Sequence, residues 1–297
     1  MSGIDLSYVI CTHNRLVFLQ ILLSRLIENI QPREEIIVVD GNSDDGTKEY
    51  LSKLYKDGKI HQFISEPDRN QAHGWNKGFL MAKGQIIKKL IDDDVFCYKA
   101  IRKCAGYMLK DPSIDVLISN DLGCSLDNPQ DIQKFSRLTQ YKKWRSGLVP
   151  SFTFGDVHML IRRSSLSHTG LYNTAYIMMD WEFSLRISYL KANIAYYNGY
   201  NALSVAHLNS VSALKNKRLV EEQGKRAEFF YEYAGDTSEI SNWSKFKISA
   251  GKILNYNKNK GSDAINKNDG EVAVNALYAH LYQHLSDIND LEEYSFL

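Results

Sequence analysis

The sequence predicts an α/β fold in which helices flank a mostly parallel sheet. Short segments rich in Ile, Val or Leu alternate with amphipathic helical patterns, and polar residues follow each apolar segment. Such alternation is typical of repeated β-α-β units. We predict strands at residues 6–11, 35–40, 60–65 and 86–91. The helices predicted between them span residues 16–28, 47–55 and 72–82.

The pattern changes after residue 94. We predict a helix at 99–110, a strand at 116–120, an irregular stretch to Pro150, a strand at 157–161 and a helix at 180–190. Beyond residue 212 we predict an amphipathic helix at 214–233, a Lys-, Asn- and Gly-rich loop at 257–270 and a helix at 272–285. The chain therefore divides into a core, residues 1–212, and a helical C-terminal extension, residues 213–297, packed on that core.

Composition is that of an ordinary globular protein. With 297 residues, of which 44% are hydrophobic and 24% charged, the chain is long enough for one large domain or a core with an extension. The 36 Lys and Arg residues nearly balance 35 Asp and Glu residues, which leaves a net charge of only +1. No overall field favours a polyanion, so we expect no nucleic-acid partner.

Cysteine usage and hydropathy bear on the compartment. Cys11, Cys97, Cys104 and Cys124 form no CxxC pair and have no histidine at metal-ligand spacing, which predicts reduced thiols and no zinc site. The first residues lack the pattern of a secretory signal, and we find no uninterrupted run of about 18 apolar residues. We therefore expect a cytoplasmic protein that meets a membrane only at its surface.

Three consecutive aspartates, residues 92–94, follow the fourth predicted strand. They place hard oxygen ligands at the carboxyl edge of the sheet, where open α/β folds bind ligands. Burying adjacent carboxylates without a cation or strong donors would raise their pKa values and cost stability. An isolated run of this kind is also compatible with a solvated acidic turn. However, polar residues follow the other three strands too, which favours one binding crevice along this edge.

Two familiar binding motifs are absent. A dinucleotide site of the Rossmann type needs GxGxxG after the first strand, and CTHNR supplies no glycine there. Residues 40–46 resemble the start of an EF-hand loop, but Gly46 falls one place late and Leu51 stands where a bidentate glutamate belongs. A nucleotide site made of carboxylates remains, in which a bound cation handles the phosphates.

Several motifs, in order, resemble those of one enzyme family. SYVICTHNR resembles a strand that ends in TYNR, and IIVVDGNSDDGT resembles IIVVDGGSTDGT. SEPDRNQAHGWNKGFLMAKGQII resembles a run with SEPD, NKG and A-x-G-x-I, and KLIDDDV lies where a DxD-type element belongs. RRSSLSHTGLYN, MMDWEFSLRIS and AHLNSVS resemble an arginine-rich strand end, a D-x-E-L-x-x-R helix start and a closing histidine with two serines. Through most of residues 5–212 the chain resembles inverting glycosyltransferases of family 2, with the GT-A fold, of the type active in capsule and O-antigen assembly.

The resemblance implies a nucleotide-sugar donor bound mainly by residues 1–95, with the acceptor and the catalytic base on residues 96–212. Thr12 and Asp40 would contact the base of the nucleotide, Asp68 and Arg69 would lie near the base or ribose, and Asp93 would hold the ribose. UDP is the expected nucleotide because the first motifs resemble uridine-using members, while GDP and dTDP stay open.

The resemblance also implies a divalent cation, Mn²⁺ or Mg²⁺. Asp94 would ligate the metal that bridges the diphosphate, with Asp92 beside it, and His207 would sit near the metal or diphosphate. Such a cation neutralises the negative charge that grows on the leaving group.

Asp180 would be the general base that accepts a proton from the attacking acceptor hydroxyl. The family usually has a glutamate before this aspartate, and Met179 stands there. An aspartate at this place is also a favoured N-cap, and the two roles can coexist. Trp181 could stack on a sugar or simply be buried. Glu182 could contact the sugar or acceptor, but its i, i+4 spacing favours a supporting ion pair with Arg186.

Rival functions remain at this point. A nucleotidyltransferase also uses carboxylates and a metal at such an edge, although CTHNR is not its glycine-rich basic loop. A non-catalytic nucleotide-sugar binder or scaffold is the rival of another class. In the extension, residues 243–260 interleave aromatic and basic side chains, which suits peripheral contact with an anionic membrane and a lipid-linked acceptor. A helix that packs its apolar face on the core fits the same pattern better.

Overall fold

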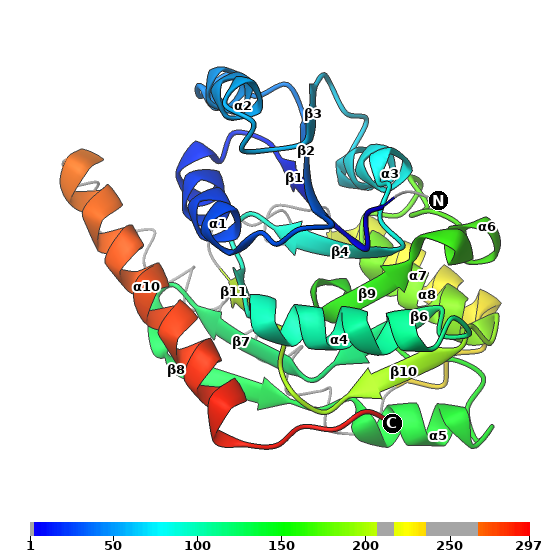
Figure 1. Cartoon of the computed structure of the whole chain (residues 1–297). Coiled ribbons are helices and arrows are strands. Elements are labelled where there is room, and N and C mark those ends of the chain that lie inside the picture. The colour runs from blue at the N-terminus through cyan, green and yellow to red at the C-terminus, as the bar shows by residue number, and fades with distance from the viewer. Residues whose placement is uncertain (1–2, 207–216, 236–266) are drawn as a thin grey trace, which may run out of the picture.

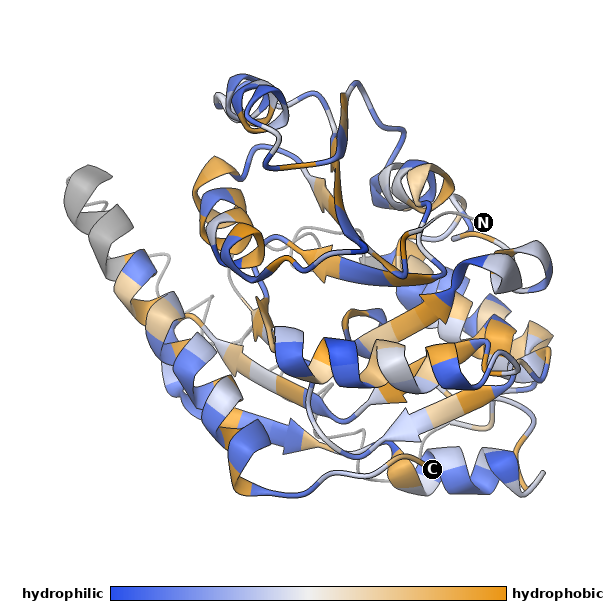
Figure 2. Cartoon of the chain, in the orientation of Figure 1, coloured by the Kyte–Doolittle hydropathy of each residue, from blue (hydrophilic) through white to orange (hydrophobic). Residues whose placement is uncertain are grey.

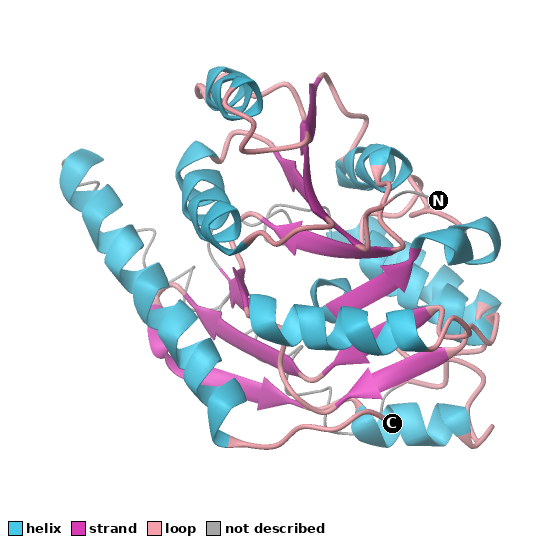
Figure 3. Ribbon diagram, viewed as in Figure 1, coloured by secondary structure: helices cyan, strands magenta, loops and turns pink. Residues whose placement is uncertain are grey.

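The computed structural model describes residues 3–206, 217–235 and 267–297. Two sheets form the framework (Figures 1 and 3). The larger has seven strands in the order β10-β6-β9-β4-β1-β2-β3. Its strands are β1 (Leu6–Thr12), β2 (Glu34–Asp40), β3 (Gln62–Ser65), β4 (Ile86–Ile91), β6 (Val116–Ser119), β9 (Met159–Arg162) and β10 (Ile194–Tyr197). All neighbours pair in parallel except β9, which is antiparallel to both β4 and β6.

The smaller sheet has four strands in the order β5-β11-β7-β8. Its strands are β5 (Val95–Phe96), β7 (Asp121–Ser125), β8 (Asn128–Phe135) and β11 (Ala202–Ala206). Strand β5 follows the aspartates directly and pairs antiparallel with β11, Leu203 opposite Val95. The aspartates therefore lie where the chain passes from the larger sheet to the smaller one.

Helices cover both faces of the larger sheet, which explains why β1, β2 and β4 are buried along almost their whole length. Tyr8 and Ile10 of β1 face α1 and α4, whereas Val9 between them faces α3. The helices are α1 (Leu16–Asn29), α2 (Thr47–Lys56), α3 (Gln71–Met81), α4 (Tyr98–Lys110), α5 (Leu138–Arg145), α6 (Leu166–Thr169), α7 (Met179–Tyr189), α8 (Lys217–Phe230) and α10 (Lys267–Leu291). Two 3₁₀ turns, η1 (Asp156–His158) and η2 (Arg163–Ser165), flank β9. No helix in the described ranges is long and apolar enough to cross a membrane.

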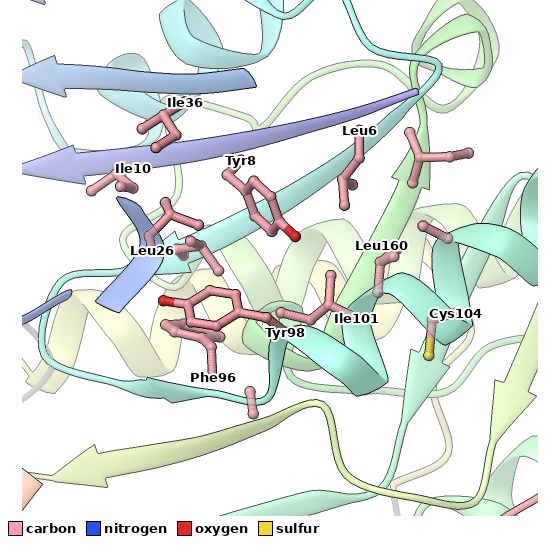
Figure 4. Close-up of a cluster of buried hydrophobic side chains, with 14 of the residues drawn as sticks. Leu6, Tyr8, Ile10, Leu26, Ile36, Phe96, Tyr98, Ile101, Cys104 and Leu160 are labelled. Atoms are coloured by element: carbon pink, nitrogen blue, oxygen red, sulfur yellow. The ribbon is translucent and has the colours of Figure 1, made fainter. Parts of the chain in front are cut away.

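A continuous apolar core joins β1 and β4 to α4. Figure 4 shows Tyr8 of β1 and Tyr98 of α4 among aliphatic side chains. Their rings meet edge to face, with centroids 6.1 Å apart. This packing anchors the strands whose ends carry the polar residues.

The predicted strands and helices of the first hundred residues are confirmed to within two residues at each end. The stretch to Pro150, expected to be irregular, instead contains β7, β8 and α5. Strand β8, with the sequence NPQDIQKF, is half-exposed and has few apolar residues, so it shows little of the hydrophobic alternation that marks a strand.

In the described part of the C-terminal extension, α10 packs on the core. Helix α10 runs along the smaller sheet (Figure 1), burying Tyr278, Leu281 and Leu285 against its strands. After α10, the backbone of Leu297 exchanges two hydrogen bonds with Tyr196 of β10, so these residues extend the edge of the larger sheet. The end predicted for the loop at residues 257–270 was wrong, because α10 already begins at Lys267. The segment 243–260 lies outside the described residues.

Candidate functional site

The polar ends of β1, β2 and β4 come together because these three strands are adjacent and parallel. Thr12, the last residue of β1, lies opposite Asp40 at the end of β2. On its other side, the Thr12 Oγ1 hydroxyl donates a 2.7 Å hydrogen bond to Asp92 Oδ2. The predicted crevice residues from three strands therefore meet at one edge of the sheet.

Arg15 lies over the aspartates from the loop before α1. Its Nη1 donates to Asp92 Oδ1 at 3.0 Å and to Asp93 Oδ2 at 2.7 Å. Sequence reasoning did not select this residue. A signal was present in CTHNR, since an arginine shortly after a β1 strand end is within reach of carboxylates at the end of the neighbouring strand.

The three carboxylates crowd one another in a buried place. Burial and the neighbouring Asp93 raise the pKa of Asp92 to about 6, although Arg15 opposes the rise. The same two causes hold the pKa of Asp94 well above its ordinary value. Burial opposes the charge of Arg15, but Asp93 and Asp92 raise its pKa. A further cation would stabilise the ionised form of these aspartates.

Residues 91–94, hereafter the aspartate turn, are held by the backbone as well. The Asp94 N–H donates to the Ile91 carbonyl at 3.1 Å. The Asp94 Oδ1 accepts a 2.8 Å hydrogen bond from the Val205 N–H in β11. From α10, the Tyr278 hydroxyl donates to the Asp93 carbonyl at 2.6 Å. The turn is therefore fixed by its own backbone and by two elements distant in sequence, β11 and α10.

Asp40 is fully buried at the end of β2. Its carboxylate accepts hydrogen bonds from the Ser43 backbone and hydroxyl, and from the Ser65 hydroxyl at 2.7 Å. These donors fix the Asp40 carboxylate. It could accept a hydrogen bond from a nucleotide base only through a lone pair that the serines leave open.

Asp68 lies beside Asp40, after β3. Its Oδ1 is 2.7 Å from Lys77 Nζ and 3.2 Å from His73 Nδ1. A Cβ placed on Gly74 of α3 would come within 2.7 Å of Asp68 Oδ2, so the absence of a side chain at Gly74 makes room for this carboxylate. Arg69 is exposed at the rim.

Asp180 lies in the first turn of α7 and is half-buried, while Met179 before it belongs to the core. A carboxylate is favourable at a helix N-terminus because it faces the positive end of the helix dipole. Trp181 is also half-buried and turns toward the C-terminal extension, since its ring meets Tyr233 edge to face at 6.1 Å. Its contact with a sugar stays a prediction.

Glu182 takes the structural role that its spacing favoured. It is fully buried, and its carboxylate accepts from Arg186 Nε at 2.9 Å and from the Tyr231 hydroxyl at 2.7 Å. Arg186 also donates to the Leu171 carbonyl at 2.7 Å. The pair ties α7 to the segment before it, and its burial speaks against a direct contact of Glu182 with sugar or acceptor.

A buried charge network connects β4 with the region of α7. Lys89 Nζ in β4 lies 2.5 Å from Asp156 Oδ2, which also accepts a 2.6 Å hydrogen bond from the Tyr172 hydroxyl. The Tyr172 ring packs against Phe183 of α7 at 4.8 Å. Lys89 also lies 4.4 Å above the ring of Trp75, a tryptophan that is buried rather than free to stack on a sugar. Strand β4 and helix α7 are thus joined through one buried network.

The chemistry of the aspartate turn suits a hard divalent cation. Mg²⁺ and Mn²⁺ prefer oxygen ligands, and the buried carboxylates of Asp92 and Asp94 have raised pKa values that a cation would reverse. Within the described residues, three or more His, Cys, Asp or Glu side chains do not converge as a complete metal cage. His207, the third expected metal residue, lies outside the described residues.

The architecture is that of a GT-A glycosyltransferase. TarS from S. aureus, solved as residues 1–349 in complex with UDP-GlcNAc, superimposes with a TM-score of 0.60 at 16% identity, over 80% of this chain and 69% of that solved fragment. The mannosyltransferase PcManGT from Pyrobaculum calidifontis, solved with GDP-Man and Mn²⁺, has a TM-score of 0.52 at 14% identity, over 97% of this chain and 88% of that one. At these identities the likeness establishes the fold.

The family follows from the sequence. The family model described as Glycosyl transferase family 2 matches residues 7–170, more than half of the chain, and the chain belongs to this family. A β-1,3-glucosyltransferase of Campylobacter jejuni that acts on GalNAc(5)-diNAcBac-PP-undecaprenol is 37% identical over 95 residues, 30% of this chain and 29% of that protein. The poly-β-1,6-N-acetyl-D-glucosamine synthase of Staphylococcus epidermidis is 23% identical over 64% of this chain and 47% of its own length. The chain thus spans less than half of these curated relatives.

Proposed function

We propose that this protein transfers a sugar from a nucleotide-diphosphate donor, with UDP favoured, to a glycan or lipid-linked acceptor, with inversion at the anomeric carbon. The observation that carries the proposal is the aspartate turn, where three consecutive aspartates are buried and two of them, Asp92 and Asp93, are bonded to Thr12 or Arg15 at the ends of adjacent parallel strands. So much buried negative charge costs stability, and a cation-bound diphosphate explains why a fold would retain it.

The donor nucleotide would lie across the ends of β1, β2 and β3. Asp40 and Thr12 would contact the base, Asp68 and Arg69 the base or ribose, and Asp93 the ribose. The donors that fix Asp40 support such a role, because a carboxylate held by Ser43 and Ser65 discriminates by position. UDP is the first candidate, in line with the UDP-GlcNAc bound to TarS, and the GDP-Man of PcManGT makes GDP the second.

Asp94, with Asp92 beside it and His207 completing the set, would hold Mn²⁺ or Mg²⁺. When bound, the cation would neutralise the charge that develops on the diphosphate as the glycosidic bond breaks. Arg15 would keep Asp92 and Asp93 ionised and oriented.

Asp180 would accept the proton of the acceptor hydroxyl as the oxygen attacks the anomeric carbon. Attack from the face opposite the diphosphate, in a single displacement, inverts the configuration. The ion pair of Glu182 and Arg186 would keep the first turn of α7 in place. Residues 96–212 would thus supply the base and the acceptor side, while residues 1–95 bind the donor.

The names of two relatives support the proposal for the acceptor. One is a glucosyltransferase whose name gives a lipid-linked oligosaccharide as its acceptor, and another is a polysaccharide synthase. We therefore place this protein in the assembly of a surface polysaccharide, such as a capsule or an O-antigen.

Thermal denaturation with UDP, GDP, dTDP or CDP, each with Mn²⁺ or with EDTA, tests the donor site. A ligand that binds only the folded state raises its stability as the ratio of concentration to Kd rises. We expect one nucleotide to stabilise the protein only with Mn²⁺. Asp94→Ala should abolish this effect, and Asp127→Asn, in an exposed turn, should preserve it.

Asp180→Asn separates catalysis from binding. This variant should keep the Mn²⁺-dependent nucleotide stabilisation and lose turnover by roughly 10²–10⁴-fold, the usual contribution of a general base. Product analysis by NMR should show inversion with the unsubstituted protein. A protein that binds the nucleotide but shows no turnover with or without Asp180 would be a binder, which overturns the enzymatic proposal.

A further inference from the structure

We propose that Tyr278, from helix α10, is a positioning residue that sets the direction of the Asp93 and Asp94 carboxylates for the cation and diphosphate. This inference rests on the proposed function. Its basis is the 2.6 Å hydrogen bond from the Tyr278 hydroxyl to the Asp93 carbonyl. The tyrosine is 1% exposed, so water does not compete for this carbonyl as it would at the surface.

The hydrogen bond acts on one particular peptide group. The Asp93 carbonyl and the Asp94 N–H belong to the same planar unit. Tyr278 holds the carbonyl end, and the Ile91 carbonyl accepts from the N–H end at 3.1 Å. A planar group held at both ends cannot rotate about its axis. Since Asp93 and Asp94 flank this group, its orientation determines the directions in which their side chains leave the backbone.

Tyr278 can perform this task because its own place is rigid. Its ring packs against Phe18 of α1, with centroids 5.9 Å apart. One turn further along α10, Leu281 is fully buried in the same apolar cluster, which also contains Val95 and Leu203 of the smaller sheet. Because α10 packs on both α1 and the smaller sheet, the Tyr278 hydroxyl is held in a fixed place against the aspartate turn.

Tyr278 differs from an ordinary core residue because of the part of the aspartate turn that it contacts. The side chains of Asp92 and Asp93 are held by Arg15, and that of Asp94 by the Val205 N–H. Tyr278 instead contacts the backbone of the turn, at the peptide group between Asp93 and Asp94. It lies outside residues 7–170, so the family match does not account for it. The C-terminal extension therefore contributes to the donor site of this chain.

The test replaces only the hydroxyl. Binding of Mn²⁺, alone and with UDP or GDP, would be measured by electron paramagnetic resonance in the unsubstituted protein and in Tyr278→Phe. Loss of one buried hydrogen bond at the turn should weaken Mn²⁺ binding by about tenfold. The matched control is Tyr294→Phe, since Tyr294 also donates to a backbone carbonyl, that of Ile288 at 3.1 Å, away from the aspartates.

Amide hydrogen exchange supplies a readout that does not depend on ligand. Exchange at residues 91–95 should quicken in Tyr278→Phe, while strand β2 should be unchanged. Equal Mn²⁺ affinity in the unsubstituted protein and Tyr278→Phe would overturn the inference, as would an equal loss in Tyr294→Phe. If the unsubstituted protein binds no Mn²⁺ with either nucleotide, the proposed function fails, and the role of Tyr278 fails with it.

Discussion

Arg15 shows how a single side chain can make a costly cluster tolerable. Its guanidinium bridges Asp92 and Asp93, and only 16% of its side chain is exposed. Without it, two buried carboxylates would face each other with no charge between them. Removing one partner of such a buried ion pair therefore tells more about its role than an estimate of the pair's total contribution to stability.

Arg15→Gln should destabilise the protein by about 2–3 kcal/mol, because it leaves buried carboxylates without their cation. Mn²⁺ should restore part of that loss, since a divalent cation replaces the missing charge. Urea denaturation with Mn²⁺ and with EDTA measures both effects.

Arg102→Gln is the matched control for this experiment. Arg102 pairs with Glu34 at 2.7 Å, away from the aspartate turn. Mn²⁺ should stabilise this variant no more than it stabilises the unsubstituted protein. Equal rescue of the two variants would contradict the assignment of the cation to the aspartate turn.

At the scale of elements, β4 is unusual because two lysines occupy the interior of a central strand. In Figure 2 the strand is hydrophobic apart from one hydrophilic stretch. Lys89 finds a carboxylate partner in Asp156. Lys88, on the opposite face, contacts neutral acceptors: the carbonyls of Val157 and Met159 and Asn201 Oδ1. Burial lowers the pKa of Lys88 from 10.5 to about 7.

This lowered pKa predicts a pH dependence of stability. Between pH 7 and pH 10.5 the unfolded chain binds a proton at Lys88 that the folded chain has largely released, so stability rises with pH across this window. The rise should amount to about 2 kcal/mol between pH 7 and pH 9. Urea denaturation should show that Lys88→Met removes this increment. Lys99→Met, at an exposed lysine, should keep it, and an unchanged slope in Lys88→Met would refute the assignment.

Elements defined by a local sequence pattern could be predicted, whereas those that depend on contacts between residues distant in the sequence could not. Strands β1, β2 and β4 were recognisable because their Ile, Val and Leu residues carry the pattern locally, and their polar ends followed from the parallel topology. Strand β8 was missed because its stability comes from pairing with β7, which leaves little periodicity in its own residues. Likewise, the role of Arg15 depends on a neighbour 77 residues away, and the contact of Tyr278 on one 185 residues away.

At the scale of the whole molecule, the C-terminal residues join the two sheets into one unit. Phe296 stacks on Tyr107 of α4 at 4.0 Å and on Tyr197 of β10 at 5.0 Å. Helix α10 closes the smaller sheet on its way to this point. Residues far beyond the family match therefore belong to the same cooperative structure as the aspartate turn.

Phe296→Ala should cost about 2 kcal/mol, less than a fully buried phenylalanine because this ring is half-buried. Tryptophan fluorescence and circular dichroism should report the loss as one coincident transition, since the extension unfolds with the core. Phe229→Ala, at a side chain that is 83% exposed, should change stability little. Two separated transitions in Phe296→Ala would instead show an extension that unfolds by itself.

The contact between Tyr278 and the aspartate turn also has a consequence for biosynthesis. Chains grow from the N-terminus and domains fold as units once their parts are available. Strands β1 to β4 are translated long before α10, so a nascent chain carries its three clustered aspartates while the tyrosine that holds their backbone has not yet been made. Translation order thus delays the fixing of the aspartate turn by Tyr278 until α10 has left the ribosome.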